Sequence, residues 1–168
     1  MAFFPLFFEM KERSVLVVGA GEVGGRRIRV LESFGANITV VASDQQPNIR
    51  QMAKEGRIRL LCVSYREIRE ELWREGKQPF FLVFAATGDP EADRMVLEDG
   101  MRFGAFVNAA GDKTKSDFYF PAIIREDEMT AGLISGGNNP GKTRETARMI
   151  RQALVSAGQN GKETKGDG

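Results

Sequence analysis

Histidine is absent from this chain, and cysteine occurs once among its 168 residues. Zinc sites of the usual kind need several Cys or His ligands, and Ser-His or Cys-His nucleophilic pairs need a histidine. The sequence therefore excludes these sites and any disulfide within the chain, and we predict no metal site. Acid–base chemistry is left to carboxylates, lysine, tyrosine or water. The single thiol, Cys62, lies in the apolar run 58–63 and is predicted to be a buried structural side chain.

An excess of either charge is also missing. Lys and Arg number 24 against 23 Asp and Glu, and no basic face with stacking aromatics points to nucleic acid. The apolar N-terminus is interrupted by Pro5 and reaches charge at Glu9, too soon for a signal peptide or a membrane span. We therefore expect a cytoplasmic protein with neither a membrane nor a nucleic-acid partner.

The first part of the chain contains alternating strand and helix patterns. Apolar, β-branched runs predict strands at 14–18, 37–41, 58–63, 80–85 and 105–108. Helix-spaced apolar residues and stop signals predict helices at 23–34, 48–54 and 90–103. Strand, helix and strand in this order form βαβ units, whose strands are parallel. The predicted fold class is therefore α/β, with a Rossmann-like doubly wound parallel sheet.

The pattern changes in the last third of the chain. Extended segments are predicted at 118–124 and 129–134, and a helix follows at 142–157. A small β-ribbon is marginal alone, so we expect a second copy of the chain to cover it in a homodimer. The predicted organisation is a Rossmann domain at 1–112, a dimerisation ribbon with a C-terminal helix at 113–157, and a disordered tail at 158–168.

A glycine fingerprint follows the first predicted strand. Gly19, Gly21 and Gly24 form G-x-G-x-x-G between a strand and a helix, within a βαβ unit. The first glycine permits a tight turn, the second lets the backbone approach a pyrophosphate, and the third packs the helix on the sheet. The phosphates would then meet the helix N-terminus, which favours anions. The alternative is a glycine turn that only packs the helix against the sheet.

The end of the second predicted strand bears on the choice of dinucleotide. An acid about 20 residues beyond the glycines normally binds the ribose hydroxyls of NAD. Here Ser43 and Asp44 are the expected ribose contacts, with Asp44 placed in the loop after the strand. The nearest arginine that could meet the 2′-phosphate of NADP is Arg50. The sequence therefore favours NAD as the cofactor.

Several longer motifs resemble a known family more specifically than the glycines do. They are Phe3-Phe4-Pro5-Leu6-Phe7, Val17-Val18-Gly19-Ala20-Gly21-Glu22-Val23, Phe84-Ala85-Ala86-Thr87, Val107-Asn108, Phe120-Pro121-Ala122-Ile123-Ile124 and Ile134-Ser135-Gly136-Gly137-Asn138-Asn139-Pro140. In these motifs, residues 3–157 resemble the precorrin-2 dehydrogenase domain of siroheme synthases, whose members often double as sirohydrochlorin ferrochelatases.

This resemblance implies an oxidoreductase of siroheme biosynthesis, a branch of porphyrin biosynthesis. The implied reaction is the NAD-dependent dehydrogenation of precorrin-2 to sirohydrochlorin. By carry-over, the residues expected to line the dinucleotide and its crevice are Glu22, Val23, Ser43, Asp44, Thr87, Gly88 and Asn108. The family's second region is an intertwined dimerisation unit, which corresponds to the ribbon predicted from the residues.

Two departures from the family pattern limit how far the family's residue roles can be assigned to this sequence. The family has an aspartate, important for catalysis and metal insertion, three residues beyond the asparagine that matches Asn108. This chain has Gly111 there and Asp112 next to it, so Asp112 is the candidate proton acceptor. Family members also continue with a helical domain that helps cover the tetrapyrrole. We therefore do not expect ferrochelatase activity, and a separate partner could supply that domain.

The carboxylates around a precorrin call for lysine or arginine donors. The candidates are Lys113, Arg144 and Arg148, the arginines sharing one helical face by spacing. Their alternative role is as solvated surface charges. Ser135 could contact the substrate or only close the second ribbon strand. The alternative function is a non-catalytic NAD-binding dimer acting as a sensor or regulatory subunit, which tetrapyrrole binding would distinguish from the dehydrogenase.

Overall fold

The computed structural model describes residues 4–74, 79–136 and 139–163. These form two compact units, a larger one at 7–118 and a smaller one at 4–6 with 119 onward. The boundary thus follows Phe118, whereas the sequence placed it after residue 112. No helix in the described part of the chain is long and apolar enough to cross a membrane.

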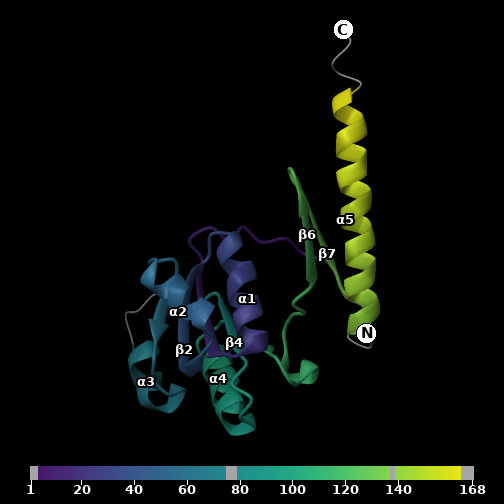
Figure 1. The fold of residues 1–168 in the computed structure, drawn as a ribbon. Coiled ribbons are helices and arrows are strands. Elements are labelled where there is room, and N and C mark those ends of the chain that lie inside the picture. Colours follow the sequence, from purple (N-terminus) through teal and green to yellow (C-terminus); the bar gives the residue numbers. More distant parts are fainter. Residues whose placement is uncertain (1–3, 75–78, 137–138, 164–168) are drawn as a thin grey trace. The chain divides into compact units, whose positions relative to one another are not determined.

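The larger unit is built on a five-stranded parallel sheet (Figure 1). Its strands are β1 (Ser14–Ala20), β2 (Asn37–Gln45), β3 (Arg59–Leu61), β4 (Leu82–Ala85) and β5 (Phe106–Ala109), in the order β3-β2-β1-β4-β5. Its helices are α1 (Glu22–Ser33), α2 (Pro47–Lys54), α3 (Tyr65–Leu72) and α4 (Pro90–Arg102). The predicted doubly wound, Rossmann-like α/β fold is confirmed.

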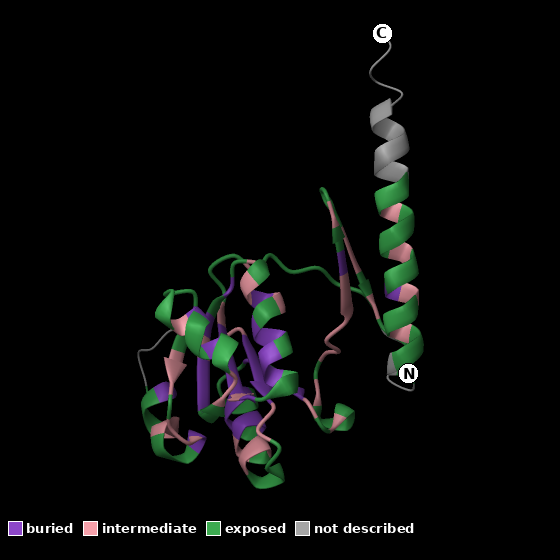
Figure 2. Ribbon diagram, viewed as in Figure 1, coloured by how far each residue is buried: buried purple, intermediate pink, exposed green. Residues whose placement is uncertain are grey.

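The sheet is buried on both faces, as parallel sheets require. Alternate residues of β1 point to opposite faces, and both sets are almost fully buried, including Val15, Leu16, Val17 and Val18. One face packs against α3 and α4 in a continuous apolar cluster. The other carries the buried side chains of α1 and α2. Burial is accordingly concentrated along the strands (Figure 2).

Helix α3 was not predicted from the sequence, although its start carries a recognisable signal. The side chain of Glu67 accepts a 2.8 Å hydrogen bond from the backbone N–H of Ser64, which precedes the helix. The hydrogen bond from the Ser64 side chain, followed by this backbone bond, lowers the pKa of Glu67. A serine followed three residues later by glutamate is the pattern of a capping box.

A buried polar cluster joins α3 to α4. Asp99 is 4% exposed and accepts a 2.7 Å hydrogen bond from the Tyr65 hydroxyl and two 2.6 Å hydrogen bonds from Arg69. The indole N–H of Trp73 donates in turn to the Tyr65 oxygen at 2.7 Å. Burial, followed by the hydrogen bond to Asp99, raises the pKa of Tyr65, so its hydroxyl stays protonated and can donate. The cluster therefore satisfies a carboxylate that would be costly to bury alone.

The outer edge of β5 is closed by the segment that follows it. The carboxylate of Asp117 accepts a 2.8 Å hydrogen bond from the Val107 N–H, and the hydroxyl of Ser116 accepts one at 2.9 Å from the Ala109 N–H. A short 3-10 turn, η1 (Lys113–Lys115), lies between the strand and these residues. Edge groups that could pair with another strand are thereby satisfied.

The smaller unit consists of an antiparallel ribbon and a helix. Strand β6 (Ala122–Glu126) pairs with β7 (Met129–Leu133), and α5 (Pro140–Glu163) packs against β6. This confirms the predicted β-ribbon and C-terminal helix, but the segment 118–120 is not part of a strand. Helix α5 also continues past the predicted end at Ala157, so its backbone is helical where the sequence suggested a disordered tail. Residues 164–168 lie outside the described part.

Candidate dinucleotide site

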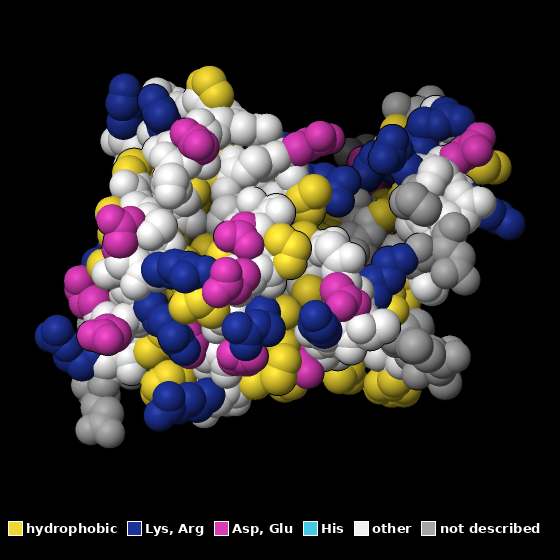
Figure 3. All heavy atoms as spheres, turned by 90° about the horizontal axis from the view of Figure 1, so that it is seen from below, with side chains coloured by type: hydrophobic (Ala, Val, Ile, Leu, Met, Phe, Trp, Pro, Cys, Tyr) yellow, Lys and Arg dark blue, Asp and Glu magenta, His cyan; other side chains and the backbone are white. Residues whose placement is uncertain are grey.

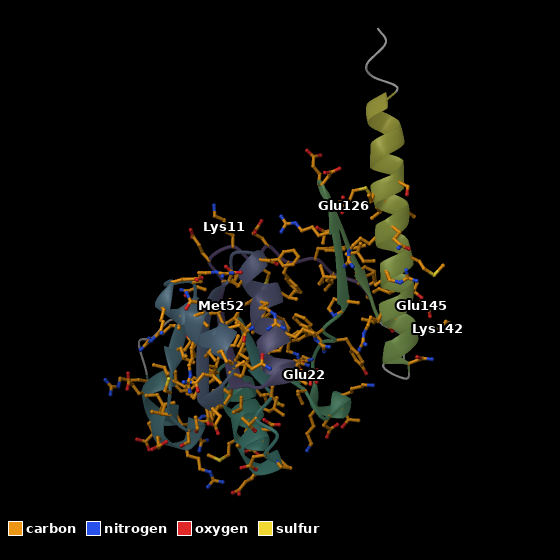
Figure 4. All side chains as sticks on the ribbon, in the orientation of Figure 1. Lys11, Glu22, Met52, Glu126, Lys142 and Glu145 are labelled. Atoms are coloured by element: carbon orange, nitrogen blue, oxygen red, sulfur yellow. The ribbon has the colours of Figure 1, made fainter. Side chains whose placement is uncertain are left out.

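The candidate site lies at the carboxyl ends of the strands in the larger unit. Strand β1 continues to β2 on one side, whereas β4 flanks it on the other, so the strand order reverses between β1 and β4. Ligands of doubly wound sheets bind at this switch point. Glu22, labelled in Figure 4, marks this edge at the start of α1, and Lys11 marks the opposite edge.

The glycine turn at this edge is shaped by two close backbone approaches. Gly19 has φ +98°, and a Cβ on it would collide with the carbonyl oxygen of Ala86. A Cβ on Gly24 would collide with the carbonyl oxygen of Gly19. Both positions therefore require glycine for the fold itself, as the fingerprint predicts for the first and third glycines.

Gly21 differs from the other two glycines. A Cβ on Gly21 would meet nothing within 4 Å, and its φ of −72° is open to any residue. It is the N-cap of α1 and, as a glycine, has no side chain to cap the helix. Open space beside an uncapped helix N-terminus suits an anionic pyrophosphate. The residues present therefore fit a dinucleotide, with Glu22 and Val23 exposed in the first turn of α1.

The end of β2 lies beside this turn. Pairing between β1 and β2 is regular up to Val18 and Val41, then shifts so that Ala20 pairs with Gln45. Ser43 and Asp44 are exposed within this irregularity. Asp44 is therefore still part of β2, which corrects its predicted place in the following loop. Among the described residues, no ion pair engages Asp44.

Two further side chains surround Gln45 at this end of the sheet. Arg50 donates a 3.4 Å hydrogen bond to the side-chain oxygen of Gln45. The side-chain nitrogen of Gln45 donates in turn to the Cys62 sulfur at 3.0 Å. Cys62 is exposed, so the prediction of a buried thiol was wrong. Strand β3 is the sheet's edge strand and spans three residues, so the chain leaves the sheet before Cys62.

The turn after β4 contains two of the predicted crevice residues. Gly88 is exposed with φ +80°, a conformation that favours glycine. Thr87 donates both its N–H, at 2.9 Å, and its hydroxyl, at 2.7 Å, to one carboxylate oxygen of Asp93. Sequence reasoning missed Asp93, whose place in the first turn of α4 suggests only a favourable charge near a helix N-terminus.

Asn108 lies at the end of β5 but is not at the surface. It is 4% exposed, and its side-chain N–H₂ donates a 2.7 Å hydrogen bond to the Phe118 carbonyl oxygen. Its side-chain carbonyl oxygen is buried without a hydrogen-bond partner among the described residues. In this structure Asn108 therefore ties β5 to the segment that closes its edge.

Asp112 occupies a defined local position. One of its carboxylate oxygens accepts hydrogen bonds from the Thr114 hydroxyl at 2.6 Å and the Thr114 N–H at 3.0 Å, and the other lies 3.5 Å from the Lys115 ammonium. The hydroxyl bond, followed by the N–H bond, lowers the pKa of Asp112 below its ordinary value. The side chain is therefore an ionised cap of η1.

The predicted substrate contacts are divided between the two units. Lys113 is exposed in η1 of the larger unit, and Arg144 and Arg148 are exposed on α5 of the smaller one. Ser135 is engaged in the turn before α5, where its hydroxyl accepts from Thr143 at 2.5 Å and donates to the Asn139 carbonyl oxygen at 3.2 Å. Lys142 and Glu145 in Figure 4 mark the beginning of α5.

Charge of one sign does not gather on the face that contains the carboxyl ends of the strands. Lysine and arginine side chains alternate there with aspartate and glutamate (Figure 3). Within the described residues, no three His, Cys, Asp or Glu side chains are grouped so that they could hold a metal ion. In the part of the chain that the structure describes, neither a patch of one charge nor a metal cluster therefore marks this face.

Comparison with known proteins decides the family. A family described as "Putative NAD(P)-binding" matches residues 6–122, which include the whole parallel sheet and the glycine turn. The chain belongs to this NAD(P)-binding family. The residues that match the NAD(P)-binding family include Gly19, Gly21 and Gly24.

Individual relatives cover almost the whole NAD(P)-binding chain. Siroheme synthase 1 of Cronobacter sakazakii is 33% identical over 93% of the chain, and siroheme synthase of Chromobacterium violaceum is 33% identical over 94%. The chain spans only 31% and 32% of these proteins. Among solved structures, SirC, a precorrin-2 dehydrogenase, matches 92% of the chain and 71% of its own, with a TM-score of 0.69 and 25% identity.

Proposed function

We propose that this protein is an NAD-dependent dehydrogenase that oxidises precorrin-2 to sirohydrochlorin. The observation that carries the proposal is the open turn at Gly21, at the uncapped N-terminus of α1, within a chain similar to a precorrin-2 dehydrogenase over 92% of its length. The similarity to siroheme synthases supports the same pathway.

The proposed roles of the residues are binding and orientation. The backbone at Gly21 and the first turn of α1 would hold the pyrophosphate, and Ser43 and Asp44 the adenosine ribose. Bound NAD⁺ would supply the electron acceptor, because one hydrogen leaves the macrocycle as a hydride and a second leaves as a proton. Asp112 is the proposed acceptor of that proton. Lys113, next to Asp112 in the larger unit, is proposed to contact a tetrapyrrole carboxylate. Arg144, Arg148 and Ser135 of the smaller unit remain predictions from the sequence.

A homodimer is proposed on the strength of the smaller unit. Its two-stranded ribbon has one helix packed against it, and ribbons of this size need a further covering surface. Large apolar side chains remain exposed on the smaller unit, both on the ribbon side and on α5: Met129, Ile134, Met149 and Val155. A second copy of the chain would cover them.

The decisive experiment mixes the purified protein with NAD⁺ and anaerobically prepared precorrin-2 and follows NADH absorbance. The expected result is NADH formation together with the spectrum of sirohydrochlorin. NAD⁺ binding without turnover would contradict the dehydrogenase proposal and favour a sensor or regulatory dimer. Omitting precorrin-2 provides the control for adventitious reduction.

Asp44 is expected to determine the preference for NAD over NADP. Asp44→Ala should weaken NAD⁺ binding about tenfold, because it removes charged hydrogen bonds to the ribose hydroxyls. The variant should also reduce the ratio of NAD⁺ affinity to NADP⁺ affinity, since the carboxylate of Asp44 would repel the 2′-phosphate of NADP⁺. Titration calorimetry with both cofactors measures the ratio. Glu70→Gln, an exposed charge loss on α3, is the matched control, and equal effects of the two variants would contradict the assignment.

Asp112 is expected to affect turnover but not cofactor binding. Asp112→Asn keeps an oxygen for the Thr114 N–H but loses the charge, so kcat should fall about 100-fold with NAD⁺ affinity unchanged. Because the pKa of Asp112 is lowered from 3.8, the wild-type carboxylate stays ionised well into the acid range. Loss of this base by protonation should therefore occur at a lower pH than for an unperturbed aspartate. Full activity of the variant would remove Asp112 from the mechanism.

A further inference from the structure

The turn after β4 is held by a carboxylate that serves no helix cap. Both donors of Thr87, the N–H at 2.9 Å and the hydroxyl at 2.7 Å, go to the same oxygen of Asp93 on α4. The Asp89 N–H donates to the Thr87 hydroxyl oxygen at 3.0 Å. Thr87 therefore has its proton donors committed, and its side chain can offer a ligand only a remaining lone pair of the hydroxyl oxygen.

Helix α4 begins without help from Asp93. Its N-cap is Asp89, whose carboxylate accepts hydrogen bonds from Glu91 and Ala92 backbone N–H groups, at 2.9 and 3.4 Å. Pro90 occupies the first turn. A favourable charge near the helix N-terminus explains an acid at position 93 but not its two bonds to Thr87. Those bonds hold the turn, and the helix has its own cap.

The turn held by Asp93 lies against the glycine turn of the candidate site. A Cβ on Gly19 would collide with the Ala86 carbonyl oxygen, so the peptide before Thr87 lies directly against the glycine turn. The Ala86 N–H donates at 2.8 Å to the Val18 carbonyl oxygen, which joins the same two strand ends. The two turns thus meet at the switch point between β1 and β4.

We propose that Asp93 is a positioning residue for the nicotinamide half of the dinucleotide. The adenosine ribose is assigned to the β2 side, at Asp44, so the other half of a ligand crossing the switch point lies over the β4 side. Asp93 fixes Thr87 there with its N–H withdrawn and a hydroxyl lone pair as the available group. This inference rests on the proposed binding of NAD and names a residue that orients it.

The test compares a whole dinucleotide with half of one. Calorimetric titration of the full chain with NAD⁺ and with ADP separates the contribution of the β4 side, because ADP lacks the nicotinamide half. Asp93→Ala is expected to weaken NAD⁺ binding about tenfold and to leave ADP binding within about twofold, as loss of one ordering hydrogen-bond pair predicts. Thr87→Val, which keeps the N–H bond to Asp93, should produce the same selective loss.

Two controls isolate the role of the carboxylate oxygen. Asp93→Asn retains a side-chain oxygen that can accept from Thr87 and should restore most of the NAD⁺ affinity. Arg94→Ala removes an exposed partner of Glu98 on the same helix and should change the affinity for neither NAD⁺ nor ADP. An unchanged NAD⁺-to-ADP ratio in Asp93→Ala and Thr87→Val, or an equal loss of both ligands, would overturn the inference. Wild-type protein that bound neither ligand would overturn the proposed function as well.

Discussion

Gly21→Leu is expected to abolish NAD⁺ binding while leaving the fold of the larger unit intact. A Cβ at Gly21 meets no atom within 4 Å apart from its chain neighbours, and the backbone there suits any residue, so we expect little folding cost. The same side chain would occupy the space in which the pyrophosphate approaches the backbone. We expect affinity to fall at least about 100-fold, equivalent to roughly 3 kcal/mol of binding free energy. Calorimetric titration with NAD⁺ and thermal unfolding measure the two properties.

The neighbouring glycine supplies the matched comparison. Gly24→Ala places a Cβ against the Gly19 carbonyl oxygen, so the helix must move from the sheet and the melting temperature should fall. The two variants therefore separate ligand access from packing within one motif. Unchanged NAD⁺ affinity in Gly21→Leu would remove the proposed site from this turn.

Among the variants proposed for this protein, Asp99→Ala is expected to lower the free energy of unfolding most. It leaves the Tyr65 hydroxyl and the Arg69 guanidinium without their shared acceptor between α3 and α4. Removing one partner of a buried pair costs about 3–5 kcal/mol, and the lower end applies because the Arg69 side chain is 38% exposed. For a unit of this size the melting temperature should fall by roughly 10 °C, measured by calorimetry.

A neighbouring acid controls for general charge loss on α4. Glu98 forms an exposed pair with Arg94, so Glu98→Ala should change the unfolding free energy by no more than about 0.5 kcal/mol. If Asp99→Ala unfolded at the same temperature as Glu98→Ala, the cluster would not link the two helices energetically. NAD⁺ affinity of folded Asp99→Ala should match wild type, because the hydrogen bonds of the cluster do not involve the glycine turn.

Local patterns in the sequence were enough to predict the main helices and strands of the fold. Apolar runs of strand length, glycine stops and the spacing of Gly19, Gly21 and Gly24 depend on neighbouring residues, which the chain displays directly. They correctly predicted the parallel sheet, the helix after β1 and the ribbon with its following helix. Helix α3 was missed because it is short, and its signal lies in the capping pair Ser64 and Glu67.

Positions that depend on distant partners could not be predicted in this way. Cys62 is exposed because β3 is the short edge strand of the sheet. Asn108 is buried because residues 116–118 close the edge of β5 and the Phe118 carbonyl oxygen accepts from its side chain. The bonds from Thr87 to Asp93 require the particular turn between β4 and α4.

The sequence by itself thus determined the α/β class, the dinucleotide motif and the family resemblance, since each is encoded in residues close along the chain. Only the tertiary structure decided which of the three glycines faces open space and which face backbone. It also decided which polar groups are free for a ligand and which are bound to the protein. The physical reason is that steric access and hydrogen-bond partners are set by segments that folding brings together.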